Sequence, residues 1–433
     1  MSYISDKLES KFNTFDLLIK FNSFLLILFV FFGVRIPFEP SNYQARFGAE
    51  TSNLPNQVLY LFLFFSSLVV VIKKFNRTLT FIRAEKYLSL FILFCLVSAF
   101  WSDFPILSMK RSFQLFVMFL VVLEALINIE PKILLKQLKI VVSLYLFFNL
   151  FSSLFIPLAI DPVFRSWRGI EVQKNLLGHS TTYCLLSSIA FFIFERTKIS
   201  KYYNAALIIV AVLIIFKSHS STNLIAVAII VFLGIIFKID SIFHQLKIGR
   251  SITGILFLFC VSFALIFFIF ASEVYTLIPG YFGKDMTLSM RVPIWEYLWT
   301  EVEKNLLFGY GFATYWIMGN VRMDVFAAHF EGFKVNEAHN GYLEIVLQLG
   351  VVGFIFFLFP IVAYIHRMIK LNSNLAIMFL ITMMTLNITE SVLFRIGMMG
   401  QTTFFFMGSY ILISVFYFNL NIVNPDEENQ SKI

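Results

Sequence analysis

The stretch GYLEIVLQLGVVGFIFFLFPIVAYI, residues 341–365, is an almost unbroken apolar run with a single charged residue, Glu344, near its start. An α-helix rises about 1.5 Å per residue, so a run of this length can cross the roughly 30 Å hydrocarbon core of a bilayer. The stretch therefore predicts a transmembrane helix, and the polar residues that precede it should lie at a membrane surface.

Similar apolar runs recur along the whole chain, of which 59% is hydrophobic and 14% charged. Because continuous Leu-, Ile- and Phe-rich runs satisfy their backbone groups in lipid only as helices, a β-barrel is excluded. We predict an all-α, polytopic transmembrane protein of about twelve helices that forms one domain over residues 1–433. The expected spans are 15–36, 57–72, 87–100, 112–129, 133–160, 176–194, 202–217, 221–237, 251–272, 341–365, 374–393 and 402–419.

The distribution of Lys and Arg predicts the orientation of these helices, because short cytoplasmic loops retain positive residues. Loops around Lys74, Lys136, Arg196 and Lys238 fall on one face, which should be cytoplasmic, and the polar residues 424–433 should form a disordered tail there. On the opposite face, residues 273–340 form one large extracytoplasmic loop. Long loops of this kind are usually functional.

Several functions are disfavoured by the residue pattern. The three cysteines, Cys95, Cys184 and Cys260, stand singly in apolar runs, without the spacing that a zinc or iron–sulfur site requires. No nucleotide-binding loop or paired-histidine motif is present, so we expect no metal and no cofactor. The net charge of +8 mostly follows the positive-inside pattern, which favours anionic membrane lipid over nucleic acid as a partner.

Cations on the outer face are not explained by the positive-inside pattern, so they are more informative about function than the cytoplasmic ones. Near helix ends, such residues can bind a phosphate or diphosphate through charge-assisted hydrogen bonds. The simpler explanation is that they extend to lipid headgroups or pair with Asp103, Glu171 and Glu390. Both explanations stay open for the set, whose main members are Arg111, Arg168, Lys174 and Arg291.

Polar residues crowd the entrance of the 341–365 helix in the sequence NEAHNGYLE, residues 336–344. A helix N-terminus attracts anions through its free backbone donors. With an ordinary pKa near 6.5, His339 can accept a proton at neutral pH, or donate one to a phosphate if it is charged. The simpler alternative is that His339 caps the helix or faces the headgroups.

Five segments of the sequence carry a further signal: AFWSDFPILSMKR (99–111), WRGIEVQKNLLG (167–178), KSHSSTNLIAVAII (217–230), SMRVPIWEYLWTEVEKNLLFGYG (289–311) and AHNGYLEIVLQLGVVG (338–353). Taken in order, they resemble the O-antigen ligase and polymerase family, whose members are bacterial inner-membrane proteins that transfer glycans from undecaprenyl diphosphate. The resemblance covers about residues 98–415. This sequence departs from the family pattern after Ser220. Ser221, Thr222 and Asn223 follow it, where the family often carries an arginine.

The resemblance implies a GT-C-like fold and an inverting, metal-independent reaction. In this reaction an acceptor hydroxyl attacks the anomeric carbon of the donor sugar while undecaprenyl diphosphate leaves. The implied catalytic residues are His339, Arg291 and Arg168, with His339 acting either as base or as diphosphate ligand and Glu344 as an alternative base. The residues expected to bind substrate are Arg111, Lys174, Asn175, Asn340, Glu344 and Trp295, although tryptophans are also enriched at membrane interfaces for purely physical reasons.

The segments KN (174–175) and ITESVLF (388–394) look more like polymerase members of the family than dedicated ligases. The expected partners are an undecaprenyl-diphosphate-linked oligosaccharide donor, a glycan or lipid A core acceptor, and a chain-length regulator protein. The active site should face the periplasm. A ligase remains the alternative, and a lipid-linked glycan flippase is less favoured because transporters usually show internal repeats and binding sites near the bilayer midplane.

Overall fold

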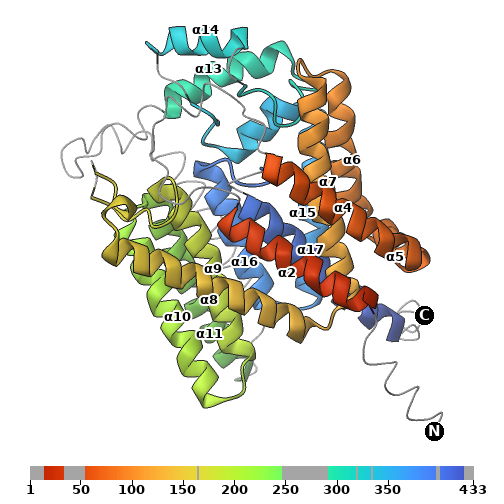
Figure 1. Ribbon diagram of the computed structural model, residues 1–433, viewed down its shortest axis with the longest axis vertical. Helices are drawn as coiled ribbons and strands as arrows, with labels where there is room; N and C mark the ends of the chain where they lie inside the picture. The colour runs from red at the N-terminus through yellow and green to blue at the C-terminus, as the bar shows by residue number, and fades with distance from the viewer. Residues whose placement is uncertain are drawn as a thin grey trace.

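The computed structural model describes residues 14–33, 54–162, 165–245, 291–317, 320–332, 335–395 and 400–423. These residues form fourteen α-helices and two short 3-10 turns, and the only bridge of β type among them joins Ile160 to Trp167 (Figure 1). The prediction of an all-α protein is confirmed.

Eight of the helices are long and apolar enough to cross a membrane. They are α2 (Thr14–Phe32), α4 (Leu54–Lys73), α7 (Pro105–Asn128), α8 (Pro131–Phe155), α9 (Lys174–Phe194), α10 (Lys198–Lys217), α11 (Ser221–Gln245) and α15 (Gly341–Lys370). Three further apolar helices accompany them: α6 (Lys86–Val97), α16 (Asn374–Thr389) and α17 (Gly400–Val423). The chain is therefore a multi-pass membrane protein.

Each expected span within the described residues coincides with one of these eleven helices. The expected span 251–272, the first part of the 273–340 loop and the 424–433 tail lie outside the described residues. Three further helices, α5 (Phe75–Ala84), α13 (Arg291–Lys304) and α14 (Val321–His329), are more polar. In Figure 1, α13 and α14 lie across one end of the helix bundle, which we call the α13 end.

Exposed apolar side chains cover the outside of the bundle, as expected for helices that face lipid. Phe155, Ile209 and Val362 are each more than 60% exposed. Helix α9 differs, because nearly every residue from Leu176 to Ser188 is buried. It packs against α8, α10 and α11 and so brings its first residues, Lys174 and Asn175, into the interior of the α13 end.

Helix α15 is broken at Gly350, where φ is 66° and ψ is −171°. The break frees backbone groups that pair with the segment following α13. The N–H of Val351 donates to the carbonyl of Leu306 at 2.8 Å, and the N–H of Gly311 donates to the carbonyl of Gln348 at 2.8 Å. Irregular backbone at membrane depth is tolerated where protein satisfies its polar groups in this way. These bonds fix the outer segment against α15.

We expect the substitution Gly350→Ala to destabilise the protein. A Cβ at this position would lie 2.2 Å from the carbonyl oxygen of Leu307, and the backbone conformation is one that only glycine adopts readily. The expected loss of about 1–3 kcal/mol should appear as a lower midpoint of thermal denaturation in detergent. The matched control is Gly234→Ala in α11, where a Cβ meets no described atom within 4 Å and an alanine should be neutral or stabilising. Equal midpoints for the two variants would contradict this account of the break.

Candidate active site

The entrance of α15 is fixed by its own capping residue. The Oδ1 atom of Asn340 accepts hydrogen bonds from the backbone N–H groups of Tyr342, at 3.0 Å, and Leu343, at 3.1 Å. An asparagine in this position stabilises a helix start by satisfying donors that have no partner within the helix. The contacts of Asn340 thus support a capping role, and its contact with substrate stays a proposal.

The peptide groups of Ala338, directly before His339, are held from both sides. The Ala338 N–H donates to Oε2 of Glu344 at 2.8 Å, and the Ala338 carbonyl accepts from Nε1 of Trp295 at 2.8 Å. The other oxygen of Glu344 accepts from Nε1 of Trp316 at 2.7 Å. Since both carboxylate oxygens of Glu344 already accept hydrogen bonds from the protein, the geometry favours a positioning role for Glu344 and Trp295 over direct chemistry.

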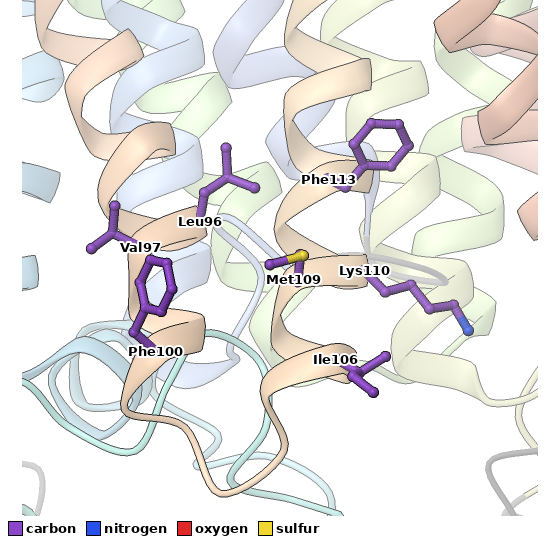
Figure 2. Close-up of a pocket in the computed structure, with 7 residues that line it drawn as sticks. All are labelled: Leu96, Val97, Phe100, Ile106, Met109, Lys110 and Phe113. Atoms are coloured by element: carbon purple, nitrogen blue, oxygen red, sulfur yellow. The ribbon is translucent and has the colours of Figure 1, made fainter.

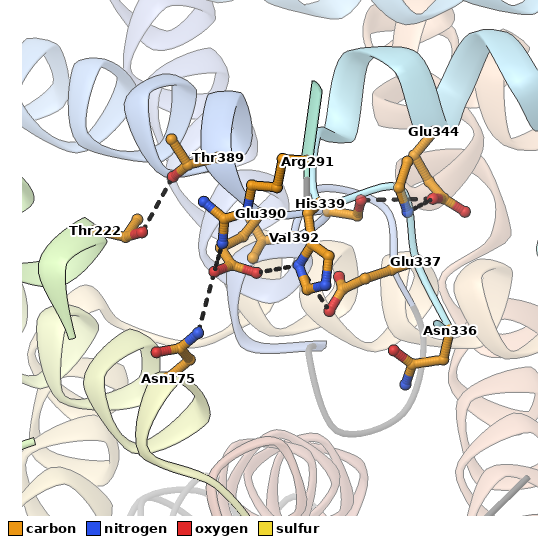
Figure 3. A network of polar contacts seen from close by, with 12 residues as sticks. Asn175, Thr222, Arg291, Asn336, Glu337, His339, Glu344, Thr389, Glu390 and Val392 are labelled. Carbon is orange, nitrogen blue, oxygen red and sulfur yellow. Dashed lines mark hydrogen bonds and ion pairs between the residues drawn. The ribbon is translucent and has the colours of Figure 1, made fainter. Parts of the chain in front are cut away.

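His339 itself adopts a left-handed backbone conformation with φ of 50°, which is uncommon for a residue other than glycine. This conformation turns its side chain toward the loop that follows α16. The Nδ1 atom lies 3.0 Å from Oε2 of Glu390 and 3.7 Å from Oε1 of Glu337 (Figure 3). The imidazole keeps 21% of its surface exposed, whereas the two carboxylates are almost fully buried.

Two arginines complete the cluster. Arg291, the first residue of α13, places Nη2 at 2.9 Å from Oε1 of Glu390, and Arg395 donates to Oε2 of Glu337. Asn175, in the first turn of α9, also donates to Oε1 of Glu390, at 3.3 Å. We call Arg291, Glu337, His339, Glu390 and Arg395 the His339 cluster. The cluster draws on three separate parts of the chain, which meet at the α13 end.

The His339 cluster has a surplus of positive charge when its imidazole is protonated, because the two guanidinium groups balance the two carboxylates. Arg111 adds to this surplus. Its guanidinium donates to the carbonyl of Ala313, and its charge is close enough to Arg395 for the two to interact. The site is therefore suited to an anionic group.

The carboxylates determine the protonation of His339. Burial alone would lower the pKa of the imidazole, but the charge of Glu337 and the hydrogen bond to Glu390 outweigh burial and raise this pKa above its ordinary value of 6.5. Burial likewise opposes ionisation of Glu390, yet the contacts with His339 and Arg291 lower the pKa of its carboxyl. Both shifts favour an imidazolium paired with a carboxylate at neutral pH.

Arg168 and Lys174 occupy the segment before and at the start of α9. The Nε atom of Arg168 donates to the carbonyl of Leu158 at 2.8 Å, and Nη1 donates to the carbonyl of Val172 at 3.1 Å. Only 5% of Arg168 is exposed, so its guanidinium supports the local backbone in this structure. Lys174 is half-buried beside Asn175. Catalytic and substrate-binding roles for these two residues remain proposals.

Sequence reasoning did not assign the carboxylates a role in the site. Glu390 was expected only as a pairing partner for outer-face cations, and Glu337 only as a neighbour of His339. The sequence does carry a signal for Glu390, which stands directly after an apolar run in ITESVLFR, residues 388–395. Ionisable groups at such positions usually have a specific function.

His179 lies close behind the cluster. It is 2% exposed in α9, and its charge would interact with Glu390, Glu337 and Arg291. Among the residues that the structure describes, neither ring nitrogen has a hydrogen-bond partner.

The spacing within the cluster also suits a metal ion, because ligand atoms of Glu337, His339 and Glu390 lie within 4.8 Å of one another. However, each carboxylate already binds a guanidinium group, from Arg395 and Arg291 respectively. A divalent cation would have to compete with two fixed positive charges. The donor set therefore fits an ion-pair network better than a metal centre.

An apolar groove lies beside the turn of α7 that carries Arg111. It has a volume of about 600 Å³ and runs between the end of α6 and the start of α7 (Figure 2). Phe100 and Ile106 on its rim are more than 80% exposed, and Lys110 is its charged member. The groove offers apolar surface to a lipid chain near the α13 end.

Fold and site together define a multi-pass membrane protein with a charged, histidine-centred cluster at one end of its helix bundle. Residues 205–358, which include Arg291, His339 and Glu344, match the family model described as O-Antigen ligase. The resemblance to the O-antigen ligase and polymerase family that was recognised in the motifs is confirmed over this part of the chain. It is also similar to the Exopolysaccharide production protein ExoQ of Rhizobium meliloti (strain 1021), with 24% identity over 318 residues, 72% of this chain and 70% of that protein.

Proposed function

We propose that this protein is a glycosyltransferase that extends polysaccharide from undecaprenyl-diphosphate-linked oligosaccharide at the periplasmic face of the bacterial inner membrane. The observation that carries the proposal is the His339 cluster, in which an imidazolium and two guanidinium groups converge at the entrance of a membrane helix. Similarity to the O-antigen ligase family supports a lipid-linked glycan as the substrate. The apolar groove beside Arg111 supplies surface for the polyprenyl chain.

In the proposed reaction the oxygen of an acceptor hydroxyl forms a bond to the anomeric carbon, with inversion, while the bond from that carbon to the diphosphate oxygen breaks. The hydroxyl proton is released to solvent water, which reaches the partly exposed site. Negative charge then develops on the departing diphosphate. Fixed positive groups at that place are typically the largest source of rate acceleration. Arginine carries five N–H donors, so Arg291 and Arg395 can bind phosphate oxygens while they keep contact with Glu390 and Glu337. No metal ion is required for this stabilisation.

The pKa of His339 favours one of the two roles considered for it. Because two carboxylates raise this pKa, the protonated imidazole is favoured near neutral pH in the absence of substrate. A protonated imidazole can donate a hydrogen bond to the diphosphate but cannot accept a proton from the acceptor. We therefore assign His339 the role of diphosphate ligand.

The pH dependence of kcat/KM tests this assignment. A raised pKa means that the proton is retained at pH values above 6.5 and is lost as the pH rises through the raised value. Activity should therefore be high at neutral pH and fall on the alkaline side. The His339→Gln variant, which has no titrating group at this position, should lack this decline in its residual activity. A rate that rises through the same range would instead identify His339 as the base.

Polymerase activity is favoured over ligase activity because the two segments that look like polymerase members meet in the structure. Asn175 of the KN segment donates to Glu390 of the ITESVLF segment. The similarity to a protein named for exopolysaccharide production supports the same choice. Transfer to lipid A core is the second candidate function, and a flippase the third.

Reconstitution of the purified protein with undecaprenyl-diphosphate oligosaccharide as the only substrate tests the proposed function. A ladder of lengthened products is expected, and it should form equally well in EDTA because protein cations supply the positive charge. No reaction until lipid A core is added would make the protein a ligase. Loss of activity in EDTA with recovery on addition of a divalent ion would contradict the metal-free mechanism.

A further inference from the structure

A second, larger cavity lies at the opposite end of the bundle from the His339 cluster. Its volume is about 1150 Å³, and it is lined by parts of α2, α7, α8, α9, α16 and α17. Its walls include the end of α9, near Phe191, and the start of α16, near Ala376. The His339 cluster instead contacts the start of α9, through Asn175, and the end of α16, through Glu390. The two sites are therefore separated by the lengths of α9 and α16.

The interior of this cavity is apolar and accessible to a ligand. Its walls include Leu26, Val122, Leu138 and Phe405. Among the residues that the structure describes, a Cβ built on Gly408 of α17 meets no atom within 4 Å, so this wall faces open space within that part of the chain. The volume exceeds the roughly 300–1,000 Å³ of ordinary small-molecule pockets. Apolar walls that face no partner atoms lose dispersion contacts, which favours occupation by an apolar chain.

The mouth of the cavity is positively charged. Lys132, Lys136 and Lys139 follow one another at helical spacing along the start of α8, and Arg196 follows the end of α9. One carboxylate, Glu195, stands among them and is 3.4 Å from Lys139. The cations thus outnumber the acidic group, and Lys132, Lys136 and Arg196 are exposed.

We infer that this cavity binds an anionic phospholipid, with the acyl chains in the apolar interior and the phosphate at Lys132, Lys136 and Arg196. A free anion fits this cavity less well than a phospholipid, because it would occupy only the basic mouth and leave the apolar interior empty. The basic mouth lies on the face that positive residues predict to be cytoplasmic, where the leaflet surface carries anionic lipid. This site is independent of the proposed transfer reaction.

Two kinds of variant of the full-length protein test the inference by native mass spectrometry, with phosphatidylglycerol or phosphatidylcholine titrated into the detergent-solubilised protein. The charge variant combines K132Q, K136Q and R196Q and should weaken phosphatidylglycerol binding by on the order of tenfold or more. The filled variant, Gly408→Leu, should lose binding of both lipids. A control with K86Q, K198Q and K238Q removes the same charge from residues of α6, α10 and α11 that do not line the cavity and should bind like the parent.

The charge variant changes only exposed side chains, so it remains informative if the filled variant does not fold. The inference is overturned if phosphatidylglycerol binds the parent and the charge variant equally, or binds no more tightly than phosphatidylcholine. It is also overturned if the parent binds phosphatidylglycerol only after residues 424–433, which include Asp426, Glu427 and Glu428, are removed. That result would assign the basic mouth to the acidic tail of the chain.

Discussion

Replacing His339 with glutamine is expected to lower the rate of glycan transfer by about 10²–10³-fold while the protein still folds. Glutamine retains a hydrogen-bond donor for Glu390 but cannot carry a positive charge. The variant therefore removes the imidazolium that faces the departing diphosphate and keeps the neighbouring contacts. The measurement is the initial rate of product formation from undecaprenyl-diphosphate oligosaccharide in proteoliposomes that contain equal amounts of protein.

The control for this variant is His329→Gln. His329 is also a histidine at the α13 end, at the end of α14, where its ring contacts Tyr297 and Phe330. It should retain close to the parental rate. Parental activity of the His339 variant, or an equal loss in both variants, would exclude the assignment of His339.

Replacing Arg291 with glutamine is expected to produce a loss of similar size, about 10²–10³-fold in kcat/KM, because a preorganised donor to the developing charge disappears. The buried carboxylate of Glu390 also loses its ion-pair partner at 2.9 Å. Arg291→Lys keeps the charge but lacks the planar fork that binds a carboxylate and a phosphate together, so it should recover only part of the activity. The measurement is the same proteoliposome assay over a range of donor concentrations.

Arg322→Gln is the matched control for Arg291. Arg322 lies in α14, pairs with Asp103 and stacks 4.0 Å above the ring of Tyr310. Its loss removes one outer-face ion pair and should leave kcat/KM nearly unchanged. If the Arg322 and Arg291 variants lose activity equally, the effect reflects general disturbance of the outer segment, and the diphosphate assignment fails.

Apolar runs were sufficient to predict the membrane helices, because length and hydrophobicity determine which segments can cross lipid. Their ends were less predictable. The span expected over 133–160 ends at Phe155 in the structure, since Pro157 cannot continue the helix and restricts the residue before it. The break at Gly350 was not predicted, because it depends on contacts with Leu306 and Leu307 from a distant segment.

Only part of the site was predictable, because some of its residues stand in local sequence motifs and others are brought together by long-range contacts. His339 and Arg291 stand in local motifs, so the family resemblance could single them out. Glu390 lies 51 residues after His339, and no local pattern connects the two. Their contact depends on the way α16 packs against α15. Likewise, the sequence could not show that Glu344 and Trp295 hold the backbone before His339, or that Arg168 binds carbonyl groups.

The most direct test of the central claim is a cryo-EM structure of the protein with undecaprenyl diphosphate bound. We predict that phosphate oxygens lie within hydrogen-bond distance of His339 and Arg291, with the polyprenyl chain leaving the site toward lipid. A diphosphate bound elsewhere, with the contacts of Glu390 to both residues unchanged, would contradict the account.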